Sequence, residues 1–169
     1  ESQADEILAG LNSLLLHRPV QYVAGYAWFL GRKFTVTPDV LIPRQETEEI
    51  VVMALRRAGL NFNGTIIDFC TGSGCIAVSL ASGLPAARVI ATDISVGALE
   101  IARQNSVAHG TGVTFLRHDL LTDNTEPLPR AGIIISNPPY VRLSEMALME
   151  PGVVQHEPHS ALFVSDSDP

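Results

Sequence analysis

The sequence is poor in positive charge. Of its eleven basic residues only Lys33 is a lysine, and the arginines are scattered along the chain, so eighteen acidic residues leave a formal net charge of −7. Proteins that bind nucleic acid usually carry a basic stripe, because neutralising phosphates supplies most of their non-specific affinity. The composition therefore argues against DNA or RNA as a direct partner.

Export signals and a disulfide framework are also missing. The N-terminal segment ESQADEILAG has neither the basic start nor the apolar run of a secretory signal, and no stretch of 18 apolar residues occurs. We therefore expect a cytoplasmic protein without a membrane partner. Cys70 and Cys75 are the two cysteines, and they bracket one short glycine-rich turn. They are too few and too close for a disulfide framework, so we expect reduced thiols that pack in the fold.

Apolar residues, in contrast, are abundant enough for one domain with a sizeable core, since 46% of the 169 residues are hydrophobic. Residues 1–18 have apolar side chains near helical spacing, which predicts the last helix of a larger N-terminal helical domain. Residues 19–45 contain two short strand patterns. They predict a β-hairpin linker with Trp28 and Phe29 in its core.

Residues 46–169 predict an α/β domain. A helix is expected over residues 46–57, because acids occupy its first turn and arginines its last. Four apolar, β-branched runs follow, with helical patterns after the first two, which is typical of right-handed crossovers and a doubly wound parallel sheet. Because the sequence ends about four strands in, we expect a sheet truncated after its fourth strand, which then has an uncovered edge. The four runs are residues 65–70, 88–94, 113–120 and 132–137.

A glycine-rich turn follows the first strand. The segment DFCTGSG, from Asp68 to Gly74, lies at a strand-to-helix junction, where glycines let the backbone approach a ligand and the helix offers unpaired N–H groups. Asp93 ends the second strand, where a carboxylate can accept both hydroxyls of a ribose. The pattern predicts an adenosine-type cofactor, although residues 72–77 also fit the G-x-G-x-x-A of a dinucleotide site.

Two further pairs are weaker candidates. Asp119 and Leu120 end the third strand and could meet an adenine, the carboxylate accepting from its amino group and the leucine packing on the ring; an aspartate that simply begins a loop is an equal alternative. His156 and His159 have i, i+3 spacing, but no third ligand is in register and Pro158 favours a loop, so we expect no metal site.

The fourth strand ends in the sequence NPPY. Asn137 precedes a proline and is therefore pushed to extended backbone, while Pro138 and Pro139 fix their own φ at about −65°. The Asn137 side-chain carbonyl, the Pro138 backbone carbonyl and the flat face of Tyr140 suit a planar NH₂ group. Two acceptors that hold both hydrogens favour pyramidal geometry, and they aim the lone pair of an amide or arylamine nitrogen at an electrophile.

NPPY together with DFCTGSG resembles the amino-methyltransferases that use S-adenosylmethionine on planar nitrogens. Residues 18–51, with LIPR before the helix, and the later HEPHSAL stretch are similar to the HemK/PrmC protein (glutamine-N5) methyltransferases. The resemblance implies a class I, Rossmann-like methyltransferase fold and methylation of the glutamine in the Gly-Gly-Gln motif of peptide-chain release factors. It leaves open a ribosomal-protein glutamine methyltransferase of the same family, an adenine-N6 nucleic-acid methyltransferase, and a non-catalytic dinucleotide-binding module.

The resemblance also implies residue roles. It makes residues 1–18 the end of a substrate-recognition domain, and it assigns catalysis to Asn137, Pro138 and Tyr140, which hold the glutamine together with Pro139. Three departures from the family pattern are Gln45 where proline is usual, Cys70 where glycine is common, and FVSDSDP at a place where a glycine-rich stretch is common. The cofactor-binding residues it implies are Asp68, Phe69, Cys70, Thr71, Gly72, Gly74, Asp93, Asp119, Leu120 and Asn137.

Overall fold

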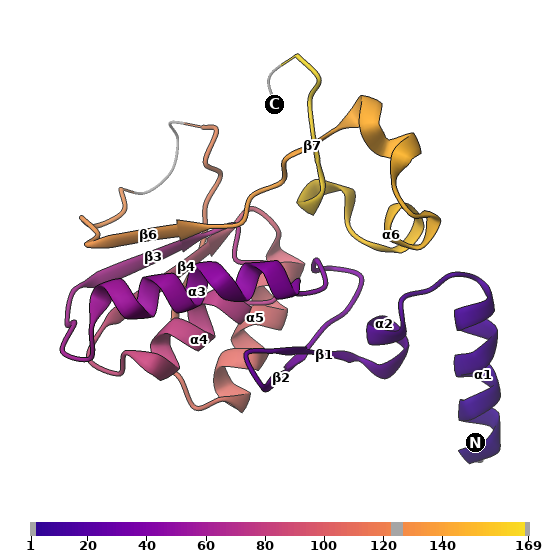
Figure 1. The fold of residues 1–169 in the computed structure, drawn as a ribbon, viewed down its shortest axis with the longest axis horizontal. Coiled ribbons are helices and arrows are strands. Elements are labelled where there is room, and N and C mark those ends of the chain that lie inside the picture. Colours follow the sequence, from indigo (N-terminus) through magenta and orange to yellow (C-terminus); the bar gives the residue numbers. More distant parts are fainter. Residues whose placement is uncertain (1–2, 123–126, 168–169) are drawn as a thin grey trace.

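Four parallel strands form the centre of the molecule (Figure 1). The computed structural model describes residues 3–122 and 127–167. The predicted parallel α/β sheet is confirmed, and its order is β5-β4-β3-β6. The strands are β3 (Thr65–Phe69), β4 (Arg88–Asp93), β5 (Thr114–Arg117) and β6 (Ile133–Ser136).

β3 is one of the two inner strands of the sheet and lies between β4 and β6. Ile67 lies beside Ile90 of β4 and beside Ile134 of β6. Ile66 and Ile67 are both buried, so the two faces of β3 are covered and the strand carries an uninterrupted apolar run.

The outer flank of β6 has no paired strand among the residues that the structure describes. Ile134 in this strand is 66% exposed although it is one of three consecutive isoleucines. The prediction of an exposed fourth strand is therefore confirmed.

Three helices lie along the sheet: α3 (Gln45–Ala58), α4 (Cys75–Gly83) and α5 (Val96–Ala108). α4 packs between the other two, and its residues 75–80 are all buried (Figure 1). Ser95 caps α5, since its hydroxyl accepts the backbone N–H of Ala98 at 3.2 Å. The loops that precede α4 and α5 lie at the edge of the sheet where the parallel strands end.

The predicted hairpin is present as β1 (Tyr26–Phe29) and β2 (Arg32–Thr35). The Glu48 carboxylate accepts the backbone N–H of Leu30 in its turn at 2.8 Å, which ties the hairpin to α3. Phe29 is buried as predicted, but the prediction for Trp28 is wrong, since its side chain is 63% exposed. Successive strand side chains point to opposite faces, so only one of these two neighbours can reach the core.

The N-terminal segment forms α1 (Gln3–Leu15) and a short α2 (Val20–Ala24). α1 stands apart from the rest of the molecule in Figure 1, and its leucines are largely exposed. The predicted helix is confirmed, while its place in a larger helical domain stays a prediction.

The C-terminal segment returns to the same edge of the sheet after the NPPY turn. Its two short strands pair in parallel, with Val141 beside Phe163. Its elements are β7 (Val141–Arg142), the 3₁₀ helix η1 (Leu143–Leu148), α6 (Pro151–His156), η2 (His159–Ala161) and β8 (Phe163–Val164).

Candidate functional site

Three loops meet at the carboxyl edge of the sheet. Residues 70–74 follow β3, Asp93 ends β4, and residues 137–140 follow β6. Ligands of parallel α/β sheets bind at this edge, because all strands of such a sheet end there. The fold thus brings the glycine-rich segment and the NPPY segment together.

A pocket, which we call the loop pocket, opens among residues 39–44, 70–73 and 160–161 together with Asp93 and Asn137. Its empty volume, counting the part open to solvent, is about 720 Å³. The predicted cofactor residues that line it are Cys70, Thr71, Gly72, Asp93 and Asn137.

Gly72 and Gly74 are required in the loop for different structural reasons. Both have positive φ, +53° at Gly72 and +79° at Gly74. A Cβ atom at Gly72 would meet no atom within 4 Å, whereas one at Gly74 would lie 3.0 Å from the Ala102 Cβ. Gly72 therefore leaves open space beside the pocket, and Gly74 allows close packing of α4 on α5.

Asp93 holds the glycine loop from β4. Its carboxylate accepts the backbone N–H of Gly72 at 2.9 Å and that of Ser95 at 2.9 Å. A carboxylate has further lone pairs for a ligand, and Asp93 lines the loop pocket. This geometry fits the predicted ribose contact.

Asp68 is fully buried and does not line the loop pocket. Burial raises the pKa of its carboxyl from 3.8 to about 7, although the Thr71 hydroxyl, which donates to Oδ2 at 2.6 Å, opposes the shift. Its Oδ1 atom has no hydrogen-bond partner among the described residues. Asp68 therefore acts on the loop through Thr71, and a direct cofactor contact stays a prediction.

The two thiols are poor nucleophiles in this fold. Burial raises the pKa of Cys70 to about 11 and that of Cys75 to about 12. Cys70 has a φ of +56°, a left-handed conformation that disfavours any residue with a Cβ atom. This backbone conformation is a physical reason why the family pattern has glycine where this chain has Cys70.

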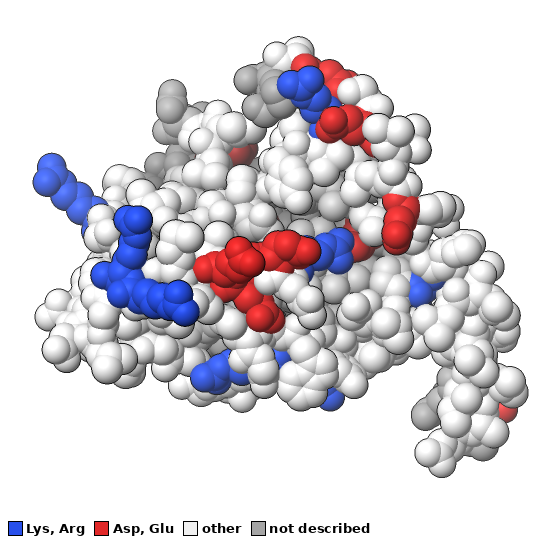
Figure 2. Space-filling view, in the orientation of Figure 1, with Lys and Arg blue, Asp and Glu red and all other residues white. Residues whose placement is uncertain are grey.

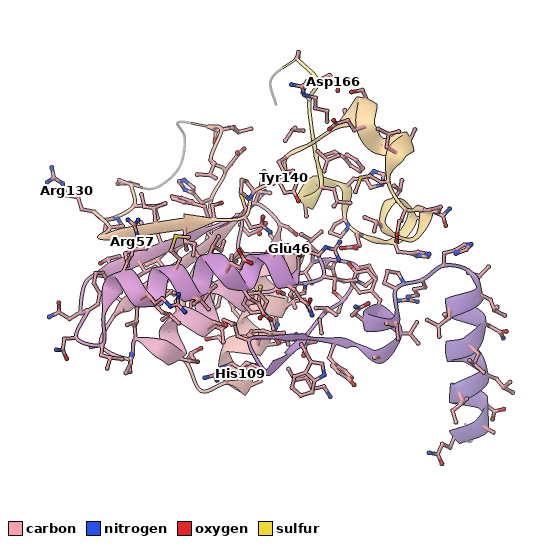
Figure 3. All side chains as sticks on the ribbon, viewed as in Figure 1. Glu46, Arg57, His109, Arg130, Tyr140 and Asp166 are labelled. Atoms are coloured by element: carbon pink, nitrogen blue, oxygen red, sulfur yellow. The ribbon has the colours of Figure 1, made fainter. Side chains whose placement is uncertain are left out.

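A second pocket, the turn pocket, shares Asn137 with the loop pocket. Pro138, Tyr140, Glu46 and residues of the C-terminal segment line it, and Figure 3 shows Tyr140 above the N-terminal end of α3, where Glu46 lies. Asn137 lines both pockets. The predicted substrate residues are therefore split, since Pro139 lines the loop pocket while Pro138 and Tyr140 line the turn pocket.

The Asn137 side chain contacts the first turn of α3. Its Nδ2 atom lies 3.4 Å from the hydroxyl of Thr47, which is buried in the first turn of α3. With Nδ2 on the Thr47 side, the Oδ1 acceptor is free for a ligand. Sequence reasoning missed Thr47, which lines both pockets.

A partly buried ion pair connects the segment before α3 with the C-terminal segment. The Glu157 carboxylate accepts from the Arg44 guanidinium at 2.6 Å and from the backbone N–H of Ile42 at 3.1 Å. Glu157 is buried, and Arg44 lines both pockets. In the sequence this stretch stands out only by its resemblance, and nothing in its spacing indicates that Glu157 is buried.

Other predicted site residues lie outside both pockets. They are Phe69, Gly74, Asp119 and Leu120. The prediction that Asp119 and Leu120 end the third strand is wrong, because β5 ends at Arg117 and both residues lie in the loop that follows. Asp119 is half-buried, and its carboxylate accepts the backbone N–H of Leu121 at 3.0 Å. Their cofactor roles stay predictions.

The two histidines that the sequence analysis considered as metal ligands each contact a backbone carbonyl. The Nε2 atom of His156 lies 3.1 Å from the Leu16 oxygen, and that of His159 lies 2.8 Å from the Val154 oxygen. Within residues 3–122 and 127–167, no group of three His, Cys, Asp or Glu side chains could hold a metal ion. Over the same ranges, no helix is long and apolar enough to cross a membrane.

Comparison with known proteins gives consistent matches. The model of the methyltransferase small domain family matches residues 46–151. The release factor glutamine methyltransferase of Staphylococcus aureus is 43% identical over 160 residues, which cover 92% of this chain and 55% of that protein. The enzyme of the same name from Bacteroides thetaiotaomicron is 47% identical over 154 residues, with 90% and 54% covered. The chain spans about half the length of these curated relatives.

A solved structure shares the fold. The T. thermophilus 16S rRNA N2 methyltransferase in complex with AdoMet and guanosine superposes with a TM-score of 0.54 at 21% identity, covering 69% of this chain and 32% of that chain. At this identity the likeness concerns the fold alone. It places the four-stranded sheet among methyltransferase-type α/β sheets.

Proposed function

Because this chain belongs to the methyltransferase small domain family, we propose that it methylates the side-chain amide nitrogen of a glutamine with S-adenosylmethionine. The proposed target is the glutamine in the Gly-Gly-Gln motif of peptide-chain release factors. Relatives that carry the name release factor glutamine methyltransferase support this target, and they confirm the resemblance to the HemK/PrmC family. A cytoplasmic site of action is part of the proposal.

The observation that carries the proposal is that Asn137 lines both pockets. A methyltransferase must bind the methyl donor and the substrate that receives the methyl group next to each other. In this arrangement the loop pocket holds the cofactor and the turn pocket holds the glutamine.

The residues of the loop pocket fit S-adenosylmethionine. Asp93 is the ribose acceptor, and the open space at Gly72 lets backbone approach the ligand. When bound, S-adenosylmethionine supplies a methyl group on a positively charged sulfur.

The NPPY turn prepares the amide for that methyl group. An amide nitrogen is a weak nucleophile because its lone pair is delocalised into the carbonyl. The Asn137 Oδ1 atom and the Pro138 carbonyl accept one N–H each, while Tyr140 packs on the planar group. Acceptors fixed before the reaction stabilise the geometry at which the lone pair is available.

The domain layout is proposed with the function. Residues 1–18 end a helical substrate-recognition domain, residues 19–45 form the hairpin linker, and residues 46–169 belong to the catalytic domain. The exposed leucines of α1 support the first assignment, because a helix with an uncovered apolar face needs a partner.

The charge distribution favours a protein substrate over a nucleic acid. Figure 2 shows basic side chains dispersed over this face and acidic ones gathered near its centre. The acids of the first turns of α3, among them Glu46 beside the turn pocket, would repel phosphates.

Incubation of the complete protein with methyl-labelled S-adenosylmethionine and a release factor tests the proposal. Mass mapping should place the label on the glutamine of the Gly-Gly-Gln motif, and a release factor with that glutamine replaced by alanine should stay unlabelled. Ribosomal protein and adenine-containing DNA serve as competing substrates. Label on either of these alone would overturn the assignment of the substrate.

A further inference from the structure

Asn105 of α5 joins the hairpin to the glycine loop. Its side chain is 1% exposed. The Oδ1 atom accepts the backbone N–H of Thr35 in β2 at 2.7 Å, and Nδ2 donates to the backbone carbonyls of Thr35 at 3.0 Å and Ser73 at 2.9 Å. One amide thus bridges two segments that are far apart in the sequence.

The chemistry of the partners fixes the orientation of this amide. A backbone N–H can only donate and a backbone carbonyl can only accept, so the oxygen must face the Thr35 N–H and the nitrogen the two carbonyls. Both N–H groups of the Asn105 side chain are used. Aspartate has the same shape but no donor, and alanine reaches neither segment.

The Ser73 carbonyl belongs to the peptide group that leads into α4. The other end of that peptide group, the Gly74 N–H, donates to the Thr71 carbonyl at 2.9 Å. Asn105 and Thr71 therefore hold the same peptide plane from opposite ends. This plane joins Ser73 to Gly74, and Gly74 has a positive φ, at a residue type whose backbone is otherwise free to rotate.

The hairpin strand that Asn105 contacts also packs on the C-terminal end of α5. The Nε2 atom of His109 at the end of this helix lies 2.9 Å from the Lys33 carbonyl, and its ring packs on Phe34 with centroids 4.8 Å apart. Figure 3 shows His109 beside the hairpin strands. The position of the hairpin is thus defined relative to the helix that carries Asn105.

We infer that Asn105 is a positioning residue through which the hairpin sets the conformation of the cofactor loop. The inference rests on the proposed function for the identity of the ligand, S-adenosylmethionine. Its consequence is that the affinity for the cofactor depends on a side chain that does not line either pocket.

The test compares Asn105→Ala and Asn105→Asp with a matched control, Ser106→Ala. Ser106 is the next residue of α5, is equally buried, and donates its hydroxyl to the Thr111 carbonyl at 2.9 Å without touching the loop. Calorimetry with S-adenosylhomocysteine and steady-state kinetics are run well below each melting temperature. The loss of the loop bond should weaken binding by about 3- to 10-fold in Asn105→Ala and raise KM for the cofactor without changing kcat.

Two outcomes would overturn the inference. One is unchanged affinity in both Asn105 variants, and the other is an equal loss of affinity in Ser106→Ala, which would show that destabilisation of α5 is the cause. Amide hydrogen exchange of residues 70–75 in the ligand-free protein provides a readout that needs no cofactor. Faster exchange in Asn105→Ala than in Ser106→Ala supports the positioning role even if the wild type binds no S-adenosylhomocysteine, a result that would count against the proposed function alone.

Discussion

The glycine loop and the proline turn lie at the same edge of the sheet but are held in opposite ways. Residues 70–74 contain the most flexible residue type, and contacts from outside fix them, through Asp93, Asn105 and the Thr92 carbonyl. Residues 137–140 contain two prolines, whose rings fix φ covalently. The first turn depends on its neighbours, whereas the second is rigid by itself.

The glycine loop is also more buried than the proline turn. Thr71 and Ser73 of the loop are buried, while Tyr140 of the turn is 73% exposed. The conformation of the loop is set by its neighbours, so substitutions around it should change binding. A turn that is stiff and exposed can present acceptors to a reacting group, and substitutions in it should change turnover.

The largest effect is expected for Asn137→Ala. The substitution removes one of two acceptors at the reacting nitrogen, and loss of one such preorganised group typically lowers kcat by about 10²–10³-fold. The cofactor affinity should change little, because the proline turn keeps its shape. Single-turnover kinetics and calorimetry measure the two quantities separately.

Asn137→Asp is the matched control for this prediction. Aspartate keeps the acceptor positions and can accept from the Thr47 hydroxyl, so it should retain more activity than alanine. Equal and complete loss in both variants, with cofactor binding also lost, would mean that Asn137 serves the loop pocket alone.

Asp93→Ala should act on binding instead. The carboxylate holds the Gly72 N–H and is placed for the ribose, and a hydrogen bond to a charged group contributes about 1.5–3 kcal/mol. We therefore expect roughly 10- to 100-fold weaker binding of S-adenosylmethionine in calorimetry. An unchanged dissociation constant, or tighter binding of NAD than of S-adenosylmethionine, would remove Asp93 from the cofactor site.

Asp68 should make the stability of the loop depend on pH. Its folded pKa of about 7 lies above its unfolded value of 3.8, so the native state keeps a proton that the unfolded state has lost. The free energy of unfolding should therefore fall as pH rises from about 4 to about 7, by at most about 1.4 kcal/mol per pH unit. Urea unfolding of wild type and Asp68→Asn over this interval tests it, and parallel curves would contradict the raised pKa.

Local patterns were sufficient to predict the strands and the main helices. The four β-branched runs became β3 to β6, although β5 ends at Arg117 rather than at residue 120, and the acids and arginines of residues 46–57 marked α3. These signals lie within each segment, so no knowledge of the packing was needed. The side of the hairpin that faces the core does depend on packing, which is why Trp28 was assigned wrongly.

The contacts that complete the site are long-range. Asn105 meets Thr35 across 70 residues, Asn137 meets Thr47 across 90, and Glu157 meets Ile42 across 115. No spacing rule within a helix or strand predicts such pairs. Asn105 did leave a signal, because it continues the buried stripe of Ala98, Ile101 and Ala102 as a polar residue, and a buried polar group needs partners.

The smallest expected effect concerns Cys70, the one residue with a Cβ atom among the left-handed positions of the glycine loop. That conformation costs about 1–2 kcal/mol for an L-residue, and glycine's greater freedom in the unfolded chain offsets about 0.4–1 kcal/mol of the relief. Cys70→Ala keeps the Cβ atom and removes only the sulfur. Cys70→Gly should therefore exceed Cys70→Ala in free energy of unfolding by about 0.5–1 kcal/mol, measured by urea denaturation. Equal stability of the two variants would show that the loop carries no backbone strain at this position.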